Sequence, residues 1–427
     1  NNNSTYGLPN NNNDIDDLDL LWDQTTAHLS SNPSSSSFPS SSFPSSSSSS
    51  NSPSSITLKQ PIVVDNGSGL FKIGFAGKDE PSSIFPTMIG YPSYSKALGA
   101  NNAASSKSTD RWVGNQAQQK RGVLSLKYPI TRGIVDDWEA MEHIWTHALE
   151  NELRVNPREH PLLMSEAPLS PKVNREKLAQ IIFETFEAPS LYVEMQALLA
   201  LYGSGLRTGV VLDCGHGVCH SVPIAEGMPF HNAIGRLNLG GVDLTNYMMK
   251  LLSDSGIKLT TSAEREIARD IKEKLGYVAV HPVQEANSVQ QRRYTLPDGQ
   301  VIHLGAERFK CAEPLFQPSL LGLEQGGVQD LVFGSVIKAD IDVRRQLLAN
   351  IVLVGGSCMF EGMFERVHKE LTQLAPPGVD VKLINSPHKQ FAAWAGGSAL
   401  ASLPTIPWVT RDQYRESGSS VLWSVQQ

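Results

Sequence analysis

The chain has 427 residues, of which 40% are hydrophobic and 19% are charged. These values are ordinary for a globular protein with two or more domains and a sizeable core. The net charge is −7, but five aspartates and no lysine or arginine precede residue 58. The rest of the chain therefore carries only −2, which argues against a basic face for direct nucleic-acid binding.

Cysteine usage and hydropathy indicate the compartment and the absence of membrane segments that we expect for this chain. The four cysteines form no C-x-x-C pair, and no histidine cluster lies at zinc spacing, which favours a reducing, intracellular compartment. No apolar run reaches the length of a membrane span, and the acidic, Asn-rich start lacks the basic region of a signal peptide. We therefore expect neither feature.

Residues 1–55 are dominated by Asn and Ser. Such a segment cannot bury enough apolar surface to offset its chain entropy, so we predict a disordered tail. Within it, the hydrophobic residues of Asp14–Asp23 fall at helical spacing between aspartates (Ile15, Leu18, Leu21 and Trp22). Two interpretations stay open: an acidic amphipathic motif that folds on a partner, or a low-complexity tail with accidental hydrophobic residues.

The folded part is expected to begin near Ile56, and two stretches in it share one pattern. Pro61–Gly77 and Thr208–Pro223 each contain a short apolar run, then Asp-x-Gly-x-Gly, then a second apolar-rich run. This pattern predicts strand–turn–strand hairpins. Glycines let backbone N–H groups surround an anion, and a neighbouring carboxylate can hold hydrated Mg²⁺. One such turn could be purely structural, but two suggest a duplicated domain that clamps a polyphosphate.

The remaining pattern alternates strands with helices, which is typical of the α/β class. Strands are expected at Leu162–Glu166 and Ile351–Val354, a hairpin at Tyr294–Val301, and a mobile excursion at Gly90–Gly122. Helices are expected at Asp136–Leu153, Pro171–Phe186, Tyr192–Tyr202 (with Gln196 as its one central polar residue), Asp243–Ser253, Ser262–Leu275, Val328–Lys338, Val343–Ala349, Gly362–Leu374, Gln390–Leu403 and Arg411–Ser417.

Many of these stretches are similar to the actin family. They are DNGSG at 65–69, KYPI at 127–130, NELRV and EHPLL within 151–163, SEAPLSP at 165–171, NREK at 174–177, ETF at 184–186, AEREIARDIKEKLGY at 263–277, LPDGQ at 296–300, LFQPS at 315–319, GGSCMF at 355–360 and WAGGSALASL at 394–403. The resemblance runs from Pro61 to about Val421 and is nearest to conventional actin.

The resemblance implies an actin-like, two-lobed α/β ATPase fold, built from a duplicated domain with a nucleotide cleft between the lobes. ATP or ADP with Mg²⁺ or Ca²⁺ would lie in the cleft, and slow ATP hydrolysis would be coupled to filament assembly. Lobe 1 would comprise residues 56–206 and 390–427, with a small mobile subdomain at about 87–123. Lobe 2 would comprise residues 207–389.

The resemblance also assigns roles to individual residues. Asp65 and Asp213 match the carboxylates around the metal, mainly through water, and Asp213 with Gln196 and His220 matches the catalytic set. Without the resemblance, Gln196 reads as a satisfied buried amide and His220 as a core histidine. The residues matched to nucleotide contacts are Gly67, Ser68, Gly69, Leu70 and Lys72 in the first turn, Gly215, His216, Gly217 and Val218 in the second, and Gly241, Arg269, Lys272, Glu273, Gly355, Gly356, Met359, Phe360 and Gln390 at the nucleoside end.

Two departures from the family pattern fall inside this set. His216 stands where the second turn usually carries an aspartate, so the clamp loses a negative charge. Gln390 stands where a lysine usually packs beside the adenine, with Lys389 one place earlier. Because the glycine cradle is intact, we expect nucleotide binding to persist, with altered affinity and hydrolysis rate.

Other departures concern assembly. The loop that normally inserts an apolar tip into the next filament subunit is Ser93–Thr109 here, with Leu98 as its only large aliphatic residue. Interfaces depend on buried apolar anchors, so we expect weakened filament contacts. Arg132 replaces a histidine that is often methylated, the chain ends in Leu422–Gln427 instead of the usual basic-aromatic end, and the long tail replaces an acidic terminus.

Three functional hypotheses follow. The first is a divergent actin of the cytoplasmic cytoskeleton, with actin-like subunits and actin-binding proteins as partners, and a partner for Asp14–Asp23. The second is an actin-related subunit of a larger complex, dynactin-like or chromatin-remodelling and then nuclear, with a mainly structural nucleotide. The third is a sugar-kinase-like enzyme, which ranks lowest because no unexplained catalytic base for a substrate hydroxyl is present.

Overall fold

The computed structural model describes residues 59–92, 111–386 and 389–424. The predictions for the tail at 1–55, its motif at 14–23 and the loop at 93–109 lie outside these residues. The chain divides into two compact units. Of the smaller one, Asn1–Thr57 with Leu403–Ile406, only the short turn at 403–406 is described. All elements below belong to the larger unit, Leu58–Ser402 with Pro407–Gln427.

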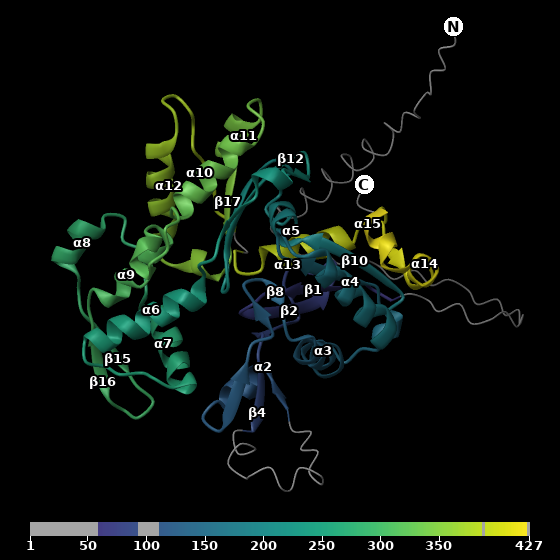
Figure 1. Ribbon diagram of the computed structural model, residues 1–427, viewed down its shortest axis with the longest axis horizontal. Coiled ribbons are helices and arrows are strands. Elements are labelled where there is room, and N and C mark those ends of the chain that lie inside the picture. Colours follow the sequence, from purple (N-terminus) through teal and green to yellow (C-terminus); the bar gives the residue numbers. More distant parts are fainter. Residues whose placement is uncertain (1–58, 93–110, 387–388, 425–427) are drawn as a thin grey trace, which may run out of the picture. The chain divides into compact units, whose positions relative to one another are not determined.

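The first hairpin lies in a six-stranded sheet of order β19-β10-β9-β1-β2-β3 (Figure 1). Strands β1, β9 and β10 are parallel, and the other neighbours are antiparallel. Helix α3 and the π-helical turn after it pack on this sheet through a core that includes Met141, Ile144 and Trp145. The strand bounds are β1 Ile62–Asn66, β2 Leu70–Phe75, β3 Ser83–Pro86, β9 Leu162–Glu166, β10 Ser190–Met195 and β19 Val409–Thr410.

The second hairpin lies in another sheet, of order β13-β12-β11-β17-β18, with β14 beside β12. Strand β11 pairs antiparallel with β12 and parallel with β17, so it repeats the relation of β1 to β2 and β9. This repetition agrees with the predicted duplication. The strand bounds are β11 Gly209–Cys214, β12 Cys219–Ala225, β13 Met228–Pro229, β14 Gly235–Leu237, β17 Ile351–Val354 and β18 Leu383–Ile384.

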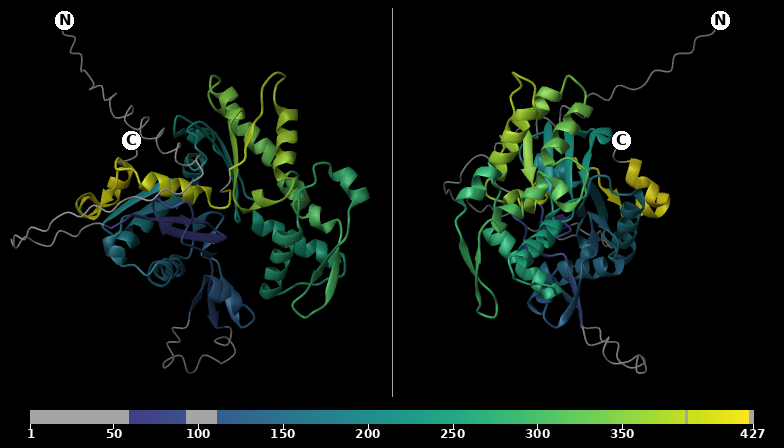
Figure 2. Two further views of the ribbon diagram at one scale, coloured as in Figure 1. Left: turned by 180° about the vertical axis from the view of Figure 1, so that it is seen from behind. Right: turned by 60° about the vertical axis from the view of Figure 1, so that its left-hand side comes forward.

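Helices α5 and α13 lie side by side and connect the cores of the two sheets (Figures 1 and 2). Helix α5 (Gln196–Tyr202) packs Leu198 and Leu201 against the second sheet. Helix α13 (Ala392–Ala401) faces the first sheet, where Trp394 Nε1 donates to Val63 O at 3.0 Å. The two helices cross at glycines: a Cβ at Gly203 would lie 2.5 Å from Ala392 O, and one at Gly396 would overlap a backbone oxygen of α5.

Most predicted elements are confirmed within one to three residues at each end, but the helix predicted at Tyr192–Tyr202 is wrong in its first part. Residues 190–195 form β10, and the helix begins at Gln196. The reason is tertiary pairing, because Leu191–Met195 lies in parallel register with Leu162–Glu166 of β9, and an available strand edge overrides local helix preference. Gln196 is therefore the first residue of the helix, at the end of the sheet.

The excursion predicted at Gly90–Gly122 also contains regular structure in its described parts. Strand β4 pairs with β5 and β6 in a three-stranded sheet, and helix α2 packs against it. A short hairpin, β7–β8, follows. The bounds are β4 Ile89–Pro92, β5 Trp112–Val113, α2 Gly114–Gln119, β6 Leu124–Lys127, β7 Ile130–Thr131 and β8 Ile134–Val135.

Some of the remaining helices pack on the two sheets, and others form a separate cluster that follows the second hairpin in the chain. That cluster contains α6 and α7, whose Met248, Leu252 and Ile271 pack against the β15–β16 hairpin. The bounds are α3 Trp138–Thr146, α4 Lys172–Gln180, α6 Gly241–Asp254, α7 Ser262–Leu275, α8 Pro282–Ser288, β15 Arg292–Thr295, β16 Val301–Leu304, α9 Glu307–Lys310, α10 Val328–Lys338, α11 Arg344–Leu348, α12 Met363–Leu374, α14 Arg411–Ser417 and α15 Val421–Ser424.

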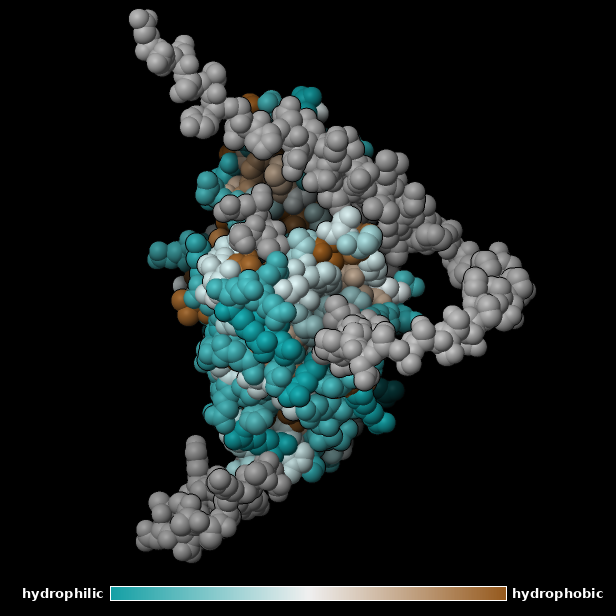
Figure 3. All heavy atoms as spheres, turned by 90° about the vertical axis from the view of Figure 1, so that its right-hand side faces the viewer, coloured by the Kyte–Doolittle hydropathy of each residue, from teal (hydrophilic) through white to brown (hydrophobic). Residues whose placement is uncertain are grey.

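In the face shown in Figure 3, hydrophilic residues cover most of the described surface, with hydrophobic residues scattered among them, which is usual for folded proteins in water. Among the described residues, no helix has the length and apolar composition needed to span a membrane.

Candidate functional site

A cavity of about 380 Å³ is lined by the turns of both hairpins and by residues from α5, α7 and the segment before α13. Every residue matched to the site from the sequence lines it: Asp65, Gly67, Ser68, Gly69, Leu70, Lys72, Gln196, Asp213, Gly215, His216, Gly217, Val218, His220, Gly241, Arg269, Lys272, Glu273, Gly355, Gly356, Met359, Phe360 and Gln390. The structure thus brings the whole set together, while the role of each member remains a prediction.

The first carboxylate, Asp65, is fully engaged by neighbouring side chains. It lies opposite Lys72 in the β1–β2 register, and Lys72 Nζ donates to its Oδ2 at 2.7 Å. Ser165 Oγ and Gln196 Nε2 donate to its Oδ1 at 2.6 and 2.9 Å. Burial alone would raise the pKa of Asp65, but Lys72 and these hydrogen bonds lower it below its ordinary value. Asp65 is therefore ionised and neutralised within the protein.

Sequence reasoning gave no role to Ser165, although it lies within the SEAPLSP stretch. Ser165 lies on β9, the parallel neighbour of β1, near the end of the strand. Polar residues at the carboxyl ends of adjacent parallel strands meet at one edge of a sheet. The predicted strand at Leu162–Glu166 therefore held the signal, but nothing in its own residues indicates that this strand pairs with β1.

The second carboxylate, Asp213, is in the opposite state. It lies opposite His220 in the β11–β12 register, and no hydrogen-bond donor within the described part of the chain reaches its oxygens. Burial, reinforced by the negative charge of Asp65, raises the pKa of Asp213 to about 6. A buried carboxylate without a donor is costly unless a cation is bound. Asp213 is therefore the stronger candidate for a metal partner.

His220 is also without a partner. Its Nε2 is buried and makes no hydrogen bond in the described structure, and it faces the same cavity as Asp213. Burial, with a smaller contribution from Arg236, lowers the pKa of His220 to about 3. The imidazole is thus neutral near pH 7, and an unsatisfied buried nitrogen beside a cavity is consistent with a ligand or water that binds there.

Glycine is required where the two turns approach each other and the third strand. A Cβ at Gly69 would lie 2.6 Å from His216 Cβ, and one at Gly217 would lie 3.2 Å from Ser68 Oγ. Gly355 follows β17 with φ of +92°, and a side chain there would collide with the Asp213 carboxylate. These glycines let the two turns approach each other at the cavity, and successive backbone N–H groups at such turns can form an anion site.

His216 has a cationic environment. Burial, together with the charges of Lys272, Arg269 and Arg265, lowers the pKa of His216 to about 3. The side chain is therefore neutral at physiological pH. Compared with the aspartate usual in the family, His216 removes a negative charge from the turn but does not add a positive one.

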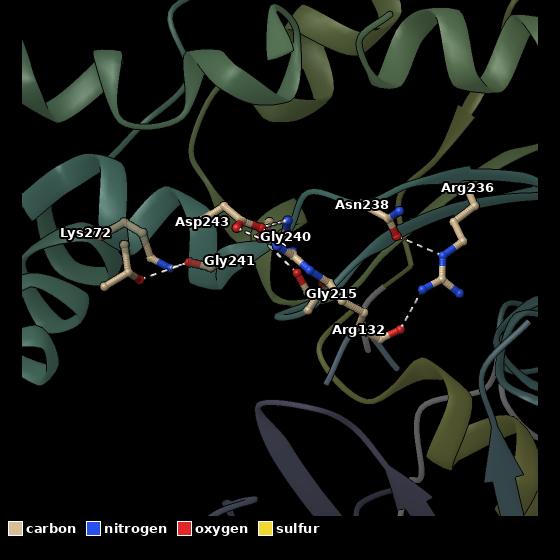
Figure 4. A network of polar contacts seen from close by, with 11 residues as sticks. Arg132, Gly215, Arg236, Asn238, Gly240, Gly241, Asp243 and Lys272 are labelled. Carbon is tan, nitrogen blue, oxygen red and sulfur yellow. Dashed lines mark hydrogen bonds and ion pairs between the residues drawn. The ribbon is translucent and has the colours of Figure 1, made fainter. Parts of the chain in front are cut away.

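The end of the cavity that was matched to the nucleoside is bounded by α7 and the turn after β17. Lys272 is buried and donates to Gly241 O at 2.8 Å (Figure 4), and its burial lowers its pKa to about 8. Arg269 pairs with Glu266 at 3.1 Å and with Glu273 at 3.6 Å. The Glu273 side chain is 59% exposed, so its carboxylate remains accessible to a ligand hydroxyl.

Two further lining residues, Gly276 and Lys389, were given no role from the sequence. Gly276 lies where a Cβ would approach the Phe360 ring to 2.9 Å, so it keeps this end of the cavity open. Lys389 lines the cavity beside Gln390, and its Nζ lies 5.8 Å from the centre of the Phe364 ring. Gly276 stood in the matched AEREIARDIKEKLGY stretch, but nothing in the helix pattern marked it as a site residue.

Comparison with known protein families gives one match. The family model described as Actin matches residues 57–425, which includes both hairpins and all the cavity residues above. The actin-family fold typically binds a nucleotide and a divalent cation. The predicted nearness to conventional actin within the family stays a prediction. The extent of the match shows that this chain belongs to the actin family.

Proposed function

We propose that the cavity binds ATP or ADP with Mg²⁺ or Ca²⁺, and that the protein hydrolyses ATP slowly as part of an actin-like assembly cycle. The observation that carries the proposal is the pair of glycine turns on one cavity, with one carboxylate neutralised by Lys72 and the other without a donor. A polyphosphate suits the backbone N–H groups, and a divalent cation suits Asp213.

The residues fit such a ligand by three separate criteria. The glycine cradle would be filled by added Cβ atoms, His220 Nε2 is buried without a partner, and the half-buried Asp213 has no donor in the described structure. When bound, the cation would supply positive charge that neutralises developing negative charge on the phosphates. Asp213 and, through water, Asp65 would hold it, and Lys72 would add a compact positive charge on the phosphate side.

Gln196 and His220 are proposed to orient the attacking water. Gln196 Nε2 donates to Asp65 and Ser165, which fixes the amide and leaves its carbonyl oxygen as the acceptor. His220 is neutral, so its Nε2 can exchange a proton with a water. Phosphoryl transfer depends mostly on positioning and electrostatics, so a neutral amide and a neutral imidazole suffice for a slow reaction.

Assembly belongs to the proposal as well. The family membership supports actin-like subunits, and proteins that bind them, as partners. The polar loop at Ser93–Thr109, which lies outside the described residues, motivates the expectation of weaker filament contacts than in ordinary actin. Sedimentation with Mg-ATP, with this loop replaced by that of a conventional actin, tests the point: a lower critical concentration is expected for the graft.

The second candidate is an actin-related subunit of a fixed complex. His216 and Gln390, which depart from the family pattern inside the cavity, favour it because they would be tolerated where the nucleotide is structural. Recovery of the native protein only together with a fixed set of non-actin subunits would support this alternative. Recovery with actin-like subunits that exchange with free protein would support the first.

The binding experiment uses the full chain after removal of metals with a chelator. A fluorescent ATP analogue is titrated with and without added Mg²⁺, and phosphate release is then measured for the wild type and for Gln196→Ala. We expect cation-dependent binding, and phosphate release that is slower in Gln196→Ala by about 10²-fold with affinity little changed. No binding at millimolar nucleotide in the presence of the cation would overturn the proposal.

A further inference from the structure

Three of the four cysteines meet behind the second glycine turn. Cys214 ends β11, Cys219 begins β12, and Cys358 lies in the short 3₁₀ turn Gly356–Met359 that follows β17. The thiol of Cys214 interacts with the thiols of both Cys219 and Cys358. All three are free and buried. Three elements that contribute residues to the first cavity therefore converge on the sulfur of Cys214.

The thiols lie on the side of the hairpin that faces away from the cavity. Cys214 follows Asp213 and Cys219 precedes His220, and successive side chains of a strand point to opposite faces. Asp213 and His220 line the cavity, whereas the two cysteines pack into the core of the second sheet. A bond between their sulfurs would thus form without filling the cavity.

The strand register gives this pair the geometry of a disulfide. Gly215 N donates to Val218 O at 3.1 Å, which closes the hairpin with a hydrogen-bonded pair. The next pair along the ladder, Cys214 opposite Cys219, is therefore a non-hydrogen-bonded pair, because the two kinds alternate. The Cα atoms of such a pair lie about 4.5 Å apart, within the range of about 4.4–6.8 Å that a disulfide spans. The bond thus requires little movement of the backbone.

We propose that Cys214 and Cys219 are a redox-sensitive pair that hydrogen peroxide converts into a reversible disulfide staple across the second turn. One thiol reduces the peroxide and becomes a sulfenic acid, with release of one water. The neighbouring thiol then attacks that sulfur, which forms the S–S bond and releases a second water. The two sulfurs together lose two electrons to the peroxide O–O bond. Two molecules of a thiol such as glutathione restore both cysteines and become glutathione disulfide.

Cys358 gives the cluster a second arrangement. Its thiol can attack the Cys214 sulfur of the staple, which forms Cys214–Cys358 and releases the Cys219 thiol without any further oxidant. That bond would connect β11 to the turn after β17 instead of to β12. Because strand pairing already holds Cys219 opposite Cys214, we expect the hairpin disulfide to be the main product and the bond to Cys358 to replace it only when Cys219 is missing.

Burial sets the speed of the reaction. Cys214 and Cys219 are 0% exposed and Cys358 is 3% exposed, so the reactive thiolate is disfavoured and the first oxidation is slow. Once one sulfur is oxidised, its partner is already in contact, so the disulfide forms before a second peroxide arrives. The pair therefore suits a response to sustained oxidant in a compartment where disulfides are otherwise rare.

Mapping of the oxidised thiols in the full chain provides the first test. Folded protein without nucleotide is treated with hydrogen peroxide, quenched in acid, unfolded, alkylated and digested with trypsin. Cys214 and Cys219 share the peptide 208–236, Cys358 lies in 346–366 and Cys311 in 311–338. We expect 208–236 to lose two hydrogens and to resist alkylation until dithiothreitol is added. Intermolecular disulfides, or sulfinic and sulfonic acids in place of the disulfide, would overturn the proposal.

Cys311 is the matched control within the same molecule. It is also fully buried, but its Sγ donates to Arg308 O at 3.2 Å instead of contacting the cluster. Unfolding of the chain would expose all four thiols, so a disulfide made in the folded state leaves Cys311 open to alkylation afterwards. Oxidation of Cys311 in step with 208–236 would show that the bond forms only in unfolded chains, which contradicts the inference.

Serine variants test which thiol is central. Cys214→Ser should form no disulfide, because Cys214 is the thiol that contacts both others. Cys219→Ser should link 208–236 to 346–366 through Cys214 and Cys358, and Cys311→Ser should behave as the wild type. An equally fast disulfide in Cys214→Ser would show that the cluster is not organised around Cys214. Should a variant not fold, the wild-type mapping still decides the main claim.

Hydrogen exchange tests whether the bond acts as a staple. Oxidised wild type should exchange the amides of 215–218 more slowly than the reduced protein, while 311–316 should exchange equally in both. Dithiothreitol should restore the faster exchange. Unchanged exchange at 215–218 despite complete disulfide formation would refute the staple. None of these measurements requires nucleotide, so failure of the proposed ATP binding would leave their results intact.

Discussion

The two Asp-x-Gly-x-Gly turns have equivalent strand pairing and opposite electrostatics. Each places an aspartate near the end of a strand, paired antiparallel with one strand and parallel with another. In the first turn, Lys72, Ser165 and Gln196 all donate to Asp65, and its pKa is lowered. In the second, Asp213 faces neutral His220 and has no donor in the described structure, so burial raises its pKa to about 6.

The difference teaches that duplicated geometry does not imply duplicated chemistry. The first turn is balanced internally, so its charges contribute to folding whether or not a ligand is present. The second turn keeps an uncompensated carboxylate and an orphan imidazole nitrogen, which cost stability and suit a ligand. We therefore expect the first turn to contribute mainly to stability and the second mainly to ligand binding, so that substitutions can separate the two effects.

The largest effect is expected from Asp65→Asn. It leaves the Lys72 ammonium, whose side chain is 11% exposed, without its carboxylate. Breaking a buried pair by removing one partner costs about 3–5 kcal/mol. Urea unfolding of nucleotide-free protein should show this loss, whereas Ser165→Ala, which removes one hydrogen bond, should cost about 1 kcal/mol. Equal losses for the two variants would mean that the ion pair contributes nothing beyond a hydrogen bond.

Asp213→Asn should act in the opposite direction on stability. In the absence of a cation it removes an unpaired, half-buried charge. A pKa raised from 3.8 to about 6 corresponds to a gain of up to about 3 kcal/mol at pH 7. The same variant should lose most of its divalent-cation affinity, measured with a calcium indicator in competition. If both aspartate variants destabilise the free protein equally, the contrast between the turns is wrong.

The pH dependence of cation binding follows from the sign of the Asp213 shift. The carboxylate is ionised above pH 6 and protonated below it, so cation affinity should fall by up to tenfold per pH unit as the pH decreases from 6 to 5. Without a cation, the folded protein takes up this proton before the unfolded chain does. The stability advantage of Asp213→Asn should therefore be complete above pH 6 and vanish below about pH 4. Unchanged cation affinity between pH 7 and 5 would exclude Asp213 as the main ligand.

The smallest effect is expected from His216→Asp. The surrounding Lys272, Arg269 and Arg265 would keep the new carboxylate ionised, and its charge should raise divalent-cation affinity several-fold. His216→Asn should leave affinity unchanged, because the imidazole is already neutral with a pKa of about 3. A marked drop in affinity for His216→Asn would show that the imidazole itself contacts the ligand or the cation.

Much of the fold could be predicted because its signals are local. Glycine spacing and β-branched runs predicted both hairpins, and helical periodicity predicted α7 and α10 with their observed bounds. The error at Tyr192–Met195 arose because these residues form a strand by pairing with β9. No local sequence pattern reveals that pairing. For the same reason the resemblance identified the cavity residues, including the donors Lys72 and Gln196, but missed the third donor, Ser165, which reaches Asp65 from a neighbouring strand.

Electrostatic states were the least predictable part of the site. Nothing in the Asp-x-Gly-x-Gly pattern distinguishes Asp65 from Asp213, because the difference lies in Lys72 being opposite one and His220 opposite the other. The position of Arg132 was noted only as a departure from the family. Its contacts with Asp243 and Gly217, more than eighty residues away, required the three-dimensional structure.

The glycine crossing of α5 and α13 has a mechanical consequence. Since Gly203 and Gly396 bring the two backbones into direct contact, no layer of side chains is available there to slide or compress. One helix packs on the second sheet and the other on the first, and both begin beside the cavity at Gln196 and Ala392. We therefore expect a change in the angle between the two sheets to pivot at this crossing, so that a small opening at the cavity would become a larger displacement at the sheet edges farthest from it.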